Sequence, residues 1–404
     1  MTDAATTALE TAVPGTPWWA TPLIAAARSL ECGMLTLHFA SGASVRIAAP
    51  LPGPVADMRV HRARAVRRIL LEGDIGLGES YRDGDWDSGD VAALIELAAR
   101  NREAVARMAD ARGPWRLWHR LCHLAQANTR AGSRRNIQAH YDLGNDFYAL
   151  WLDETLTYSA ARFDRPSLSL AEAQHEKYRR LITDLNLAPG QSVLEIGCGW
   201  GGFAEAAARH GAHVTGLTLS PAQLAYAQTR IEAAGLAPNA DLRLEDYRDV
   251  RGTFDCIVSI EMFEAVGEEN WPQYFAAVRD RLKAGGRAIV QTITIAEDRF
   301  AHYRRSTDFI QKHIFPGGLL PSEPAFAEAT NQAGLLLERT ERFGAGYATT
   351  LAHWAQAFRA RARELGALGF DARFRRLWEF YLGYCEGGFR AGTLDIQQFH
   401  LARP

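Results

Sequence analysis

The sequence lacks any long apolar run, and none of its hydrophobic stretches approaches the ~20 residues that a membrane-spanning helix requires. Its first residues are small and polar, without the basic start and apolar centre of a signal peptide. The five cysteines are scattered and form no CxxC pair, a usage typical of a reducing cytoplasm rather than of a disulfide framework or a metal site. A net charge of −2 gives no overall attraction to nucleic acid. We therefore expect a cytoplasmic globular protein with no bound metal and no nucleic-acid partner.

At 404 residues the chain is long for a single domain. Apolar residues alternate over 35–47 and predict a hairpin, residues 57–72 predict a helix, a glycine-rich stretch follows at 73–78, and residues 91–101 predict another helix. The predicted organisation is a flexible arm over 1–20, a small α+β domain over 21–108, a linker over 109–139 and a catalytic domain over 140–404.

The linker has an unusual composition. Residues 111–138 contain six arginines and no acidic residue, and tryptophans interleave with the arginines at helical spacing. A basic helix with tryptophans on its apolar side is typical of a segment that lies in a membrane interface. The alternative is a helix docked on the protein with its arginines solvated. His119 and His123 lie four residues apart, but no third ligand is nearby to complete a metal site.

From residue 191 short apolar segments alternate with helical ones. The predicted strands cover 192–196, 213–217, 242–244, 256–260 and 287–292, and the predicted helices cover 202–210, 222–234 and 271–282. This alternation predicts an α/β fold with a doubly wound, mainly parallel sheet. Residues 326–389 are rich in helix-forming and aromatic residues, and we expect them to complete the substrate side.

A glycine-rich turn, Gly197–Gly202, follows the first of these strands. The turn satisfies the dinucleotide pattern GxGxxG, so by itself it does not identify the ligand. A nicotinamide dinucleotide site needs a carboxylate after the second strand, but the chain has none between Glu205 and Glu232. Glu195, two residues before the turn, belongs to the form of this loop that binds S-adenosylmethionine. We therefore expect that cofactor, with a nicotinamide-dependent oxidoreductase as the alternative.

Several segments together resemble the cyclopropane-fatty-acyl-phospholipid synthases and the mycolic acid methyltransferases. The matching segments are 140–148, 156–159, 197–202, 216–223, 246–249, 261–267, 314–318, 320–322 and 343–350, with 76–86 in the N-terminal region. The resemblance implies a class I methyltransferase sheet with a smaller N-terminal α+β lipid-binding domain. It also implies a homodimer that acts on unsaturated acyl chains at a phospholipid membrane surface, peripherally associated with the inner membrane.

The resemblance also implies which residues bind the cofactor. These are Tyr158, Ser159, Glu195, Gly197, Gly199, Gly201, Thr218, Gln223, Asp246 and Tyr247. Thr218 and Gln223 would supply the polar contacts to the cofactor that a carboxylate supplies in other nucleotide-binding sheets.

The implied reaction is methyl transfer from the sulfonium of the cofactor to a carbon–carbon double bond, which leaves a carbocation in the lipid. Aromatic faces stabilise a cation, and Tyr158, Phe263 and Tyr347 are candidates. A base must then remove a proton. Which proton leaves decides between a cyclopropane, a methyl or methylene branch, and a methylated diene that is a precursor of a furan fatty acid.

In the cyclopropane synthases the base is a bicarbonate held by a cysteine, a glutamate, a histidine, an isoleucine backbone and a tyrosine. The corresponding catalytic positions here are Ala160, Glu264, Gln291, Ile293 and Tyr347, so the cysteine and the histidine are replaced. Ala265 also stands where the family usually has a histidine. We expect the bicarbonate site to be weakened or absent, or Glu264 to act directly as the base with a pKa raised by apolar surroundings. Two further alternatives are a methyltransferase of a soluble small molecule and a non-catalytic protein that binds lipid or cofactor.

Overall fold

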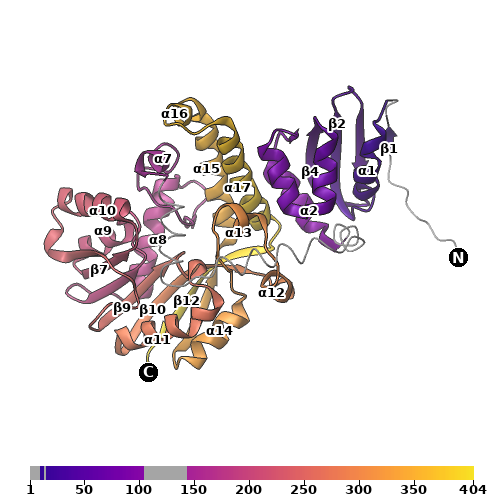
Figure 1. The fold of residues 1–404 in the computed structure, drawn as a ribbon. Helices are drawn as coiled ribbons and strands as arrows, with labels where there is room; N and C mark the ends of the chain where they lie inside the picture. The colour runs from indigo at the N-terminus through magenta and orange to yellow at the C-terminus, as the bar shows by residue number, and fades with distance from the viewer. Residues whose placement is uncertain (1–9, 13–14, 104–142) are drawn as a thin grey trace. The chain divides into compact units, whose positions relative to one another are not determined.

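The computed structural model describes residues 10–12, 15–103 and 143–404, and Figure 1 traces their path. The predicted linker at 109–139 and the start of the family-like segment at 140–142 lie outside the described residues. The chain divides into two compact units. Of the described residues, unit 1 contains 10–12, 15–103, 306–312 and 354–393, and unit 2 contains 143–305, 313–353 and 394–404. Within the described parts of the chain, no helix is both long and apolar enough to cross a bilayer.

Unit 1 is built around a five-stranded sheet of order β1-β3-β2-β4-β5. The predicted hairpin is confirmed as the antiparallel pair β2 and β3, in which β2 buries every second side chain. The elements are β1 Glu10–Ala12, η1 Trp18–Ala20, α1 Thr21–Ala27, β2 Cys32–Phe39, β3 Ser44–Ala48, β4 Leu51–Val60, α2 Ala63–Arg82, β5 Trp86–Asp87, α3 Val91–Arg100, most of α13 Phe309–His313, the end of α15 Gly344–Ala360, α16 Ala362–Ala367 and α17 Ala372–Arg390.

The helix predicted over 57–72 is misplaced. Residues 57–60 belong to β4, and α2 begins at Ala63 and continues through the glycine-rich stretch to Arg82. The glycines serve close packing there rather than a loop, because a Cβ on Gly78 would come within 2.4 Å of the Phe309 ring. Gly73, with φ 62°, marks a kink in the helix, a conformation that glycine adopts more readily than other residues.

The C-terminal helix α17 packs within unit 1. Gly383 and Gly387 let it approach α3 closely, because a Cβ on Gly387 would come within 2.6 Å of the Ile95 side chain and of the Ala92 carbonyl. The boundaries predicted from the sequence assigned residues 354–393 to the catalytic domain. In the structure they join the N-terminal elements, because small residues on α17 and apolar residues on α3 form one core.

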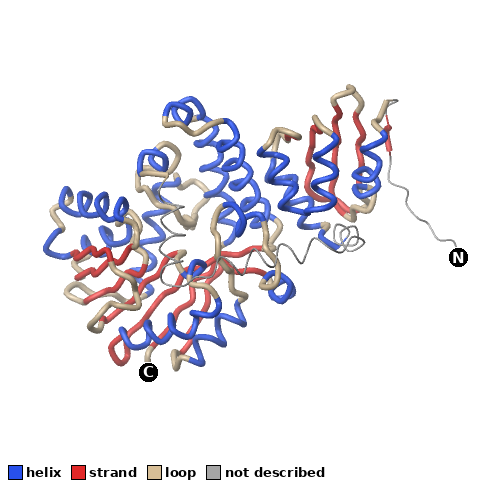
Figure 2. The backbone as a smooth tube through the Cα atoms, viewed as in Figure 1, coloured by secondary structure: helices blue, strands red, loops and turns tan. Residues whose placement is uncertain are grey.

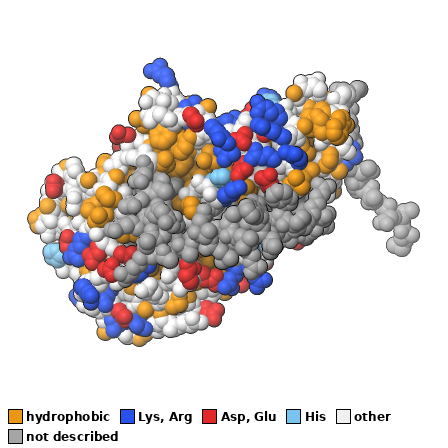
Figure 3. Space-filling model, in the orientation of Figure 1, with side chains coloured by type: hydrophobic (Ala, Val, Ile, Leu, Met, Phe, Trp, Pro, Cys, Tyr) orange, Lys and Arg blue, Asp and Glu red, His pale blue; other side chains and the backbone are white. Residues whose placement is uncertain are grey.

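Figure 3 shows acidic and basic side chains mixed with hydrophobic ones over one face of the molecule. In unit 1 the buried carboxylate of Asp85 accepts hydrogen bonds from Arg62 (3.1 Å) and Arg64 (2.7 Å). The described part of the same unit exposes five large apolar side chains, and the most exposed are Trp18 (86% exposed), Val55 (64%) and Leu51 (61%). Unit 1 thus combines a paired internal charge with apolar surface open to solvent.

Unit 2 contains a seven-stranded sheet of order β11-β12-β10-β9-β6-β7-β8, whose path is visible in Figure 2. The five strands from β8 to β10 are parallel, and β12 is antiparallel to both β10 and β11. The elements are α7 Asn145–Ala149, α8 Leu170–Asp184, β6 Ser192–Ile196, α9 Gly202–Arg209, β7 His213–Thr218, α10 Pro221–Ala233, η2 Ala237–Asn239, β8 Ala240–Leu244, β9 Phe254–Ile260, η3 Phe263–Ala265, η4 Glu268–Asn270, α11 Trp271–Arg281, β10 Leu282–Ile295, α12 Glu297–Tyr303, α14 Glu323–Gln332, β11 Leu336–Arg342, most of α15 and β12 Leu394–Ala402.

Helices cover both faces of this sheet. Val193 faces a core formed with α8, α9 and α10, whereas its neighbour Leu194 faces a second core formed with α11 and α14. The predicted doubly wound α/β sheet is therefore confirmed, with all five predicted strands and all three predicted helices between them. The antiparallel strands β11 and β12 were not predicted. β11 is mostly solvent-accessible and lies at the sheet edge, so it has no apolar run to reveal it.

Candidate active site

The glycine turn after β6 has the backbone that a close ligand requires. Gly197, Gly199 and Gly201 have φ values of 87°, 51° and 82°, in the left-handed region that favours glycine. The N–H groups of Gly197 and Cys198 both donate to the Leu217 carbonyl, at 3.0 and 2.8 Å, and tie the turn to β7. A Cβ on Gly199 would meet no atom within 4 Å. The turn is therefore rigid at its base and open at Gly199.

Glu195 lies inside the sheet just before this turn. It is 3% exposed, and its Oε2 atom has no hydrogen-bond partner among the described residues. Burial raises the pKa of this carboxyl to about 8, although Lys177 and a hydrogen bond from the Ala204 backbone act in the opposite direction. A buried acceptor without a donor is costly unless a ligand supplies one. Together with the open space at Gly199, it fits the expected S-adenosylmethionine.

The end of β7 carries a paired hydroxyl and amide in place of a carboxylate. The Thr218 hydroxyl donates to Gln223 Oε1 at 3.0 Å and accepts from the Ser220 N–H at 3.2 Å. Ser220 also caps α10 through the Gln223 N–H. All three residues are buried. The structure thus brings Thr218 and Gln223 together at the same edge of the sheet as the glycine turn.

Asp246 and Tyr247 follow β8 at that edge. The Asp246 carboxylate accepts from Arg248, with Nη2 to Oδ2 at 2.6 Å and the Arg248 N–H to Oδ1 at 3.0 Å. The Tyr247 ring meets the Tyr274 ring edge-on at 5.4 Å. Asp246 is therefore held in place by its own local turn, a contact that the sequence prediction did not include.

The segment with Tyr158 and Ser159 is strained and anchored. Leu156 has φ 50°, an unfavourable value for a residue with a branched side chain. The Tyr158 ring packs against the rings of Tyr148 and Trp151, at 5.3 and 5.6 Å. The Ser159 hydroxyl accepts from Lys177 Nζ at 2.6 Å. Tyr158 is thus part of an aromatic cluster, and Ser159 is held by a buried lysine.

Lys177 is a member of the site that the sequence prediction missed. Its side chain is fully buried, and Nζ donates to the Ser159 hydroxyl and, at 3.0 Å, to the Ala160 carbonyl. Loss of hydration lowers its pKa to about 8, while the carboxylates of Glu261, Asp153 and Glu195 oppose that shift. A lysine at this depth is rare without such charges nearby. Its position in α8, outside every motif, gave no sequence signal.

Glu264 lies in η3, directly after β9. Its Oε1 atom accepts from the Ile293 N–H at 2.6 Å, and its Oε2 atom has no hydrogen-bond partner among the described residues. Burial first, and then the nearby negative charge of Glu261, raise its pKa to about 8. Glu264 and the Ile293 backbone, which were predicted as two separate positions of an anion site, bond directly to each other, and one carboxylate oxygen is left available to accept a proton.

Glu261 is the residue on which the remaining predicted side chains converge. Its Oε1 atom accepts from the Ala160 N–H and from the Gln291 amide, both at 2.8 Å, and its Oε2 atom accepts from the Tyr347 hydroxyl at 2.7 Å. Loss of hydration is the largest effect and raises its pKa overall, although Lys177 and these three donors act in the opposite direction. The sequence prediction placed Glu261 in a motif but gave it no role. An acidic residue at the end of a buried parallel strand was the available signal.

Gln291 is locked in this network from both sides. It is fully buried, and its side-chain oxygen accepts from the Gln398 amide at 2.9 Å while its own amide donates to Glu261. Ala160, Gln291 and Tyr347, which correspond to bicarbonate-holding positions of the synthases, therefore donate to a carboxylate of the chain itself.

Phe263 does not serve as a cation-stabilising face. It is fully buried, and its ring packs against Trp271, Tyr274, Phe275 and Phe326 at 5.0–5.3 Å. It belongs to the apolar core beneath the site.

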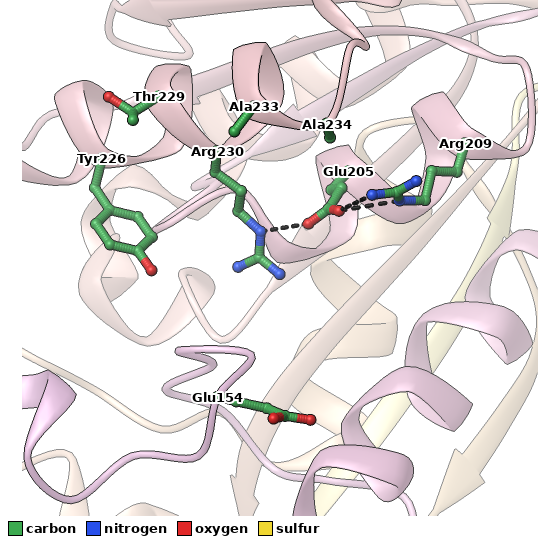
Figure 4. Close-up of a pocket in the computed structure, with 8 residues that line it drawn as sticks. All are labelled: Glu154, Glu205, Arg209, Tyr226, Thr229, Arg230, Ala233 and Ala234. Carbon is green, nitrogen blue, oxygen red and sulfur yellow. Dashed lines mark hydrogen bonds and ion pairs between the residues drawn. The ribbon is translucent and has the colours of Figure 1, made fainter.

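A pocket lies apart from these residues, between α9 and α10. Figure 4 shows Glu205 between Arg209 and Arg230, and the Arg230 Nε to Glu205 Oε2 distance is 2.5 Å. None of the predicted site residues lines it. Glu205 there pairs with both Arg209 and Arg230, and the pocket lies away from the residues of the site, so we do not assign it to the reaction.

Comparison with known proteins gives one consistent result. A match to the family of mycolic acid cyclopropane synthetases covers residues 128–399. The chain is 41% identical over 385 residues to a tuberculostearic acid methyltransferase of Mycobacterium tuberculosis, a match that covers 91% of this chain and 88% of the relative. It is 35% identical over 366 residues to a cyclopropane-fatty-acyl-phospholipid synthase of Escherichia coli, covering 86% of this chain and 88% of the relative.

A solved structure agrees. A mycolic acid cyclopropane synthase complexed with SAH and CTAB is similar with a TM-score of 0.62 and 34% sequence identity. The match covers 67% of this chain and 98% of that protein.

Proposed function

This chain belongs to the mycolic acid cyclopropane synthetase family and is an S-adenosylmethionine-dependent methyltransferase, and from that premise we propose that it methylates a carbon–carbon double bond in the acyl chain of an unsaturated phospholipid. The relatives named above act on lipid acyl chains by their printed names, and this chain covers 88% of the length of each of the two curated ones. The alternative is a methyltransferase of a soluble small molecule.

One observation carries the proposal. The glycine turn and Glu264 follow β6 and β9, which are adjacent parallel strands, so both lie at the same edge of the sheet. When bound, S-adenosylmethionine supplies an electrophilic methyl group. Glu195, Thr218 and Gln223 would hold the cofactor from the β6 and β7 side. Glu264 would face the reacting carbon from the β9 side, with Oε2 free to receive a proton.

The double bond of the substrate is a weak nucleophile, so the protein must promote its attack on the methyl group. An alkene needs close alignment and a site without water, because water would capture the cation. Tyr158 lies in an aromatic cluster with Tyr148 and Trp151, and Tyr347 is 6% exposed. We propose that these rings exclude water and that the faces of Tyr158 and Tyr347 stabilise the developing cation, by about 0.5–2 kcal/mol each.

The proton leaves to Glu264. A C–H bond next to the cationic carbon breaks, its electron pair forms the new bond, and the proton moves to Glu264 Oε2. Only the ionised carboxylate can accept it. Because the pKa of Glu264 is raised to about 8, the rate should increase with pH up to about that value.

We propose a branched product rather than a ring. The 41% identical relative is named as a methyltransferase, not as a cyclopropane synthase. The positions of the synthases' cysteine and histidine are Ala160 and Gln291 here, and the Gln291 amide is fixed by Gln398 and Glu261. A hydride shift to the cationic carbon followed by loss of a proton from the new methyl group gives a methylene branch. Loss of a proton from a chain carbon gives a methylated alkene. Neither route needs an oxidant or a reductant.

The test is turnover on vesicles of a monounsaturated phospholipid with S-adenosylmethionine that carries a trideuterated methyl group. Mass spectrometry of the released fatty acids, with the double bond located by derivatisation, separates the products. A methylene branch retains two deuterium atoms and a double bond, a methylated alkene retains three, and a cyclopropane retains two without a double bond. A cyclopropane would contradict the proposed product. Transfer only to water-soluble acceptors would contradict the proposed substrate.

We also propose that the enzyme works at a membrane surface, peripherally on the cytoplasmic side of the inner membrane, as a homodimer. The exposed Trp18, Leu51 and Val55 of unit 1 support the first part, because apolar side chains open to solvent are suited to a lipid interface. Flotation with anionic vesicles tests membrane binding, and light scattering coupled to size exclusion tests the dimer. Failure to float with vesicles would contradict the membrane proposal.

A further inference from the structure

Three hydrogen-bond donors from three distant segments point at one place in unit 2. The Ala160 N–H comes from the loop before α8, the Gln291 amide from β10, and the Tyr347 hydroxyl from α15. All three lie within 2.7–2.8 Å of the two Glu261 carboxylate oxygens. Donors that converge in this way form a binding site for a small carboxylate or carbonate anion. In this chain a tethered carboxylate already occupies it.

The backbone of Glu261 is adapted to this task. Its φ of 51° lies in the left-handed region, which a residue with a Cβ adopts at an energetic cost. Its N–H donates to the Gln291 carbonyl at 2.8 Å, so β10 holds this conformation. Unfavourable backbone geometry that the surrounding structure maintains is a common feature of functional sites. Glycine would adopt this φ at a lower energetic cost. The presence of glutamate here therefore indicates that its carboxylate has a role.

Glu261 and Glu264 have different surroundings. Glu261 has three donors and the buried ammonium of Lys177 nearby, all of which favour its charged form. Glu264 has one backbone donor and a free oxygen. Burial raises the pKa of both carboxyls, but only Glu261 has donors on both oxygens and an ammonium nearby to oppose that shift. Glu261 is therefore the better suited of the two to hold a negative charge, and Glu264 the better suited to exchange a proton.

Gln398 sets the orientation of the site. Its amide donates to the Gln291 oxygen, which forces the Gln291 amide nitrogen toward Glu261. Ala160 contributes only its backbone N–H to the carboxylate. Ala160 and Gln291 thus replace residues that hold a free anion in the synthases, and both donate to the carboxylate of Glu261.

We propose that Glu261 is a built-in anion: a positioning residue whose carboxylate fills the site of a dissociable carboxylate or carbonate, so that the enzyme needs no bicarbonate. This rests on the proposed function. The fixed charge balances the cationic cofactor and the cation in the substrate, and it holds the Tyr347 hydroxyl in place.

The central test is Glu261→Gly. Glycine relieves the positive φ and leaves the three donors facing an empty, carboxylate-sized space. In buffer stripped of dissolved carbon dioxide, this variant should lose activity by about 100-fold, and added bicarbonate or formate should restore most of it. The wild-type rate should stay the same with and without bicarbonate. Glu261→Gln is the matched control, because its amide fills the space without a charge, so it should lose activity and gain nothing from either anion.

A second readout does not depend on turnover. Bicarbonate or formate should raise the Tm of Glu261→Gly, because a ligand that binds only the folded state stabilises it, and should leave the wild-type Tm unchanged. A wild-type enzyme without activity on phospholipid vesicles would refute the proposed function, yet the two Tm responses would still decide the inference.

Two results would overturn the inference. One is a wild-type rate that falls when bicarbonate is removed and recovers when it is returned. The other is a Tm of the wild type that responds to bicarbonate as much as that of Glu261→Gly. Should the glycine variant fail to fold, the bicarbonate dependence of the wild-type rate decides alone.

Discussion

The two halves of the site in unit 2 are built in different ways. The centre of the cofactor half consists of Glu195, the turn Gly197–Gly202, Thr218 and Gln223, which lie within 29 residues of one another along the chain, while the other predicted cofactor residues lie before α8 and after β8. The reaction half consists of Ala160, Glu261, Glu264, Gln291 and Tyr347, which are spread over nearly 190 residues. The first is a local structure that one strand, one turn and the next strand define. The second exists only once the sheet, η3 and α15 have packed.

The difference has a consequence for substitution. In the cofactor half, most contacts are between neighbours in sequence, such as the hydrogen bond between Thr218 and Gln223. In the reaction half, each donor to Glu261 comes from another element, so one change affects several segments. We therefore expect changes in the reaction half to reduce turnover strongly and changes in the cofactor half to weaken cofactor binding moderately.

The largest effect should come from Glu264→Gln. The amide keeps the size of the side chain but cannot accept a proton, so kcat should fall by about 10³-fold, within the range usual for loss of a general base. The affinity for the cofactor, measured by calorimetry, should stay within about twofold of the wild-type value, because Glu264 belongs to the reaction half and is not expected to contact the cofactor. A turnover number equal to that of the wild type would remove Glu264 from the mechanism.

A smaller effect should follow from Thr218→Val in the cofactor half. The variant loses the hydrogen bond from the hydroxyl to Gln223, and about 1 kcal/mol of the binding free energy of the cofactor is lost with it. The Kd for S-adenosylmethionine should therefore rise roughly fivefold. At saturating cofactor kcat should be unchanged. Thr218→Ser, which keeps the hydroxyl, is the control. A fall in kcat with unchanged Kd would contradict the division between the two halves.

The smallest effect concerns stability and pH. The folded-state pKa of Glu264 is raised from 4.5 to about 8, so the folded protein binds this proton more tightly than the unfolded one. Its contribution to stability is fully present below about pH 4.5 and is lost as the pH rises through about 8. The free energy of unfolding in urea should therefore fall over this interval. In Glu264→Gln the slope should be shallower, and an identical slope would show that Glu264 does not titrate as described.

Much of the fold could be predicted because it depends on local patterns. The central strands β6 and β9 are largely buried apolar runs, and the helices α9 and α10 begin near recognisable signals, the turn at Gly201 and the Ser220 cap. The edge strand β11 carries mostly accessible side chains and was not predicted. The packing of α17 on α3 through small residues in unit 1 was also not predicted, because it depends on a partner helix nearly 300 residues away along the chain.

The candidate site likewise has a part that local sequence patterns predicted and a part that only the packing of distant segments revealed. The sequence by itself determined the cofactor turn, because glycines at those positions, combined with an acid-free end of β7, indicate S-adenosylmethionine rather than a nicotinamide dinucleotide. It also indicated most residues of the reaction half, since Ala160, Gln291 and Tyr347 converge on one point, but it gave no role to Glu261, which lies at that point. Only the tertiary structure decided what they meet. A hydrogen bond depends on distance and direction, and sequence spacing does not encode either for residues on separate elements. Three positions that correspond to the synthases' bicarbonate site therefore proved to donate to Glu261. The role of Lys177 became visible only once the packing of α8 had placed its ammonium against Ser159 and Ala160.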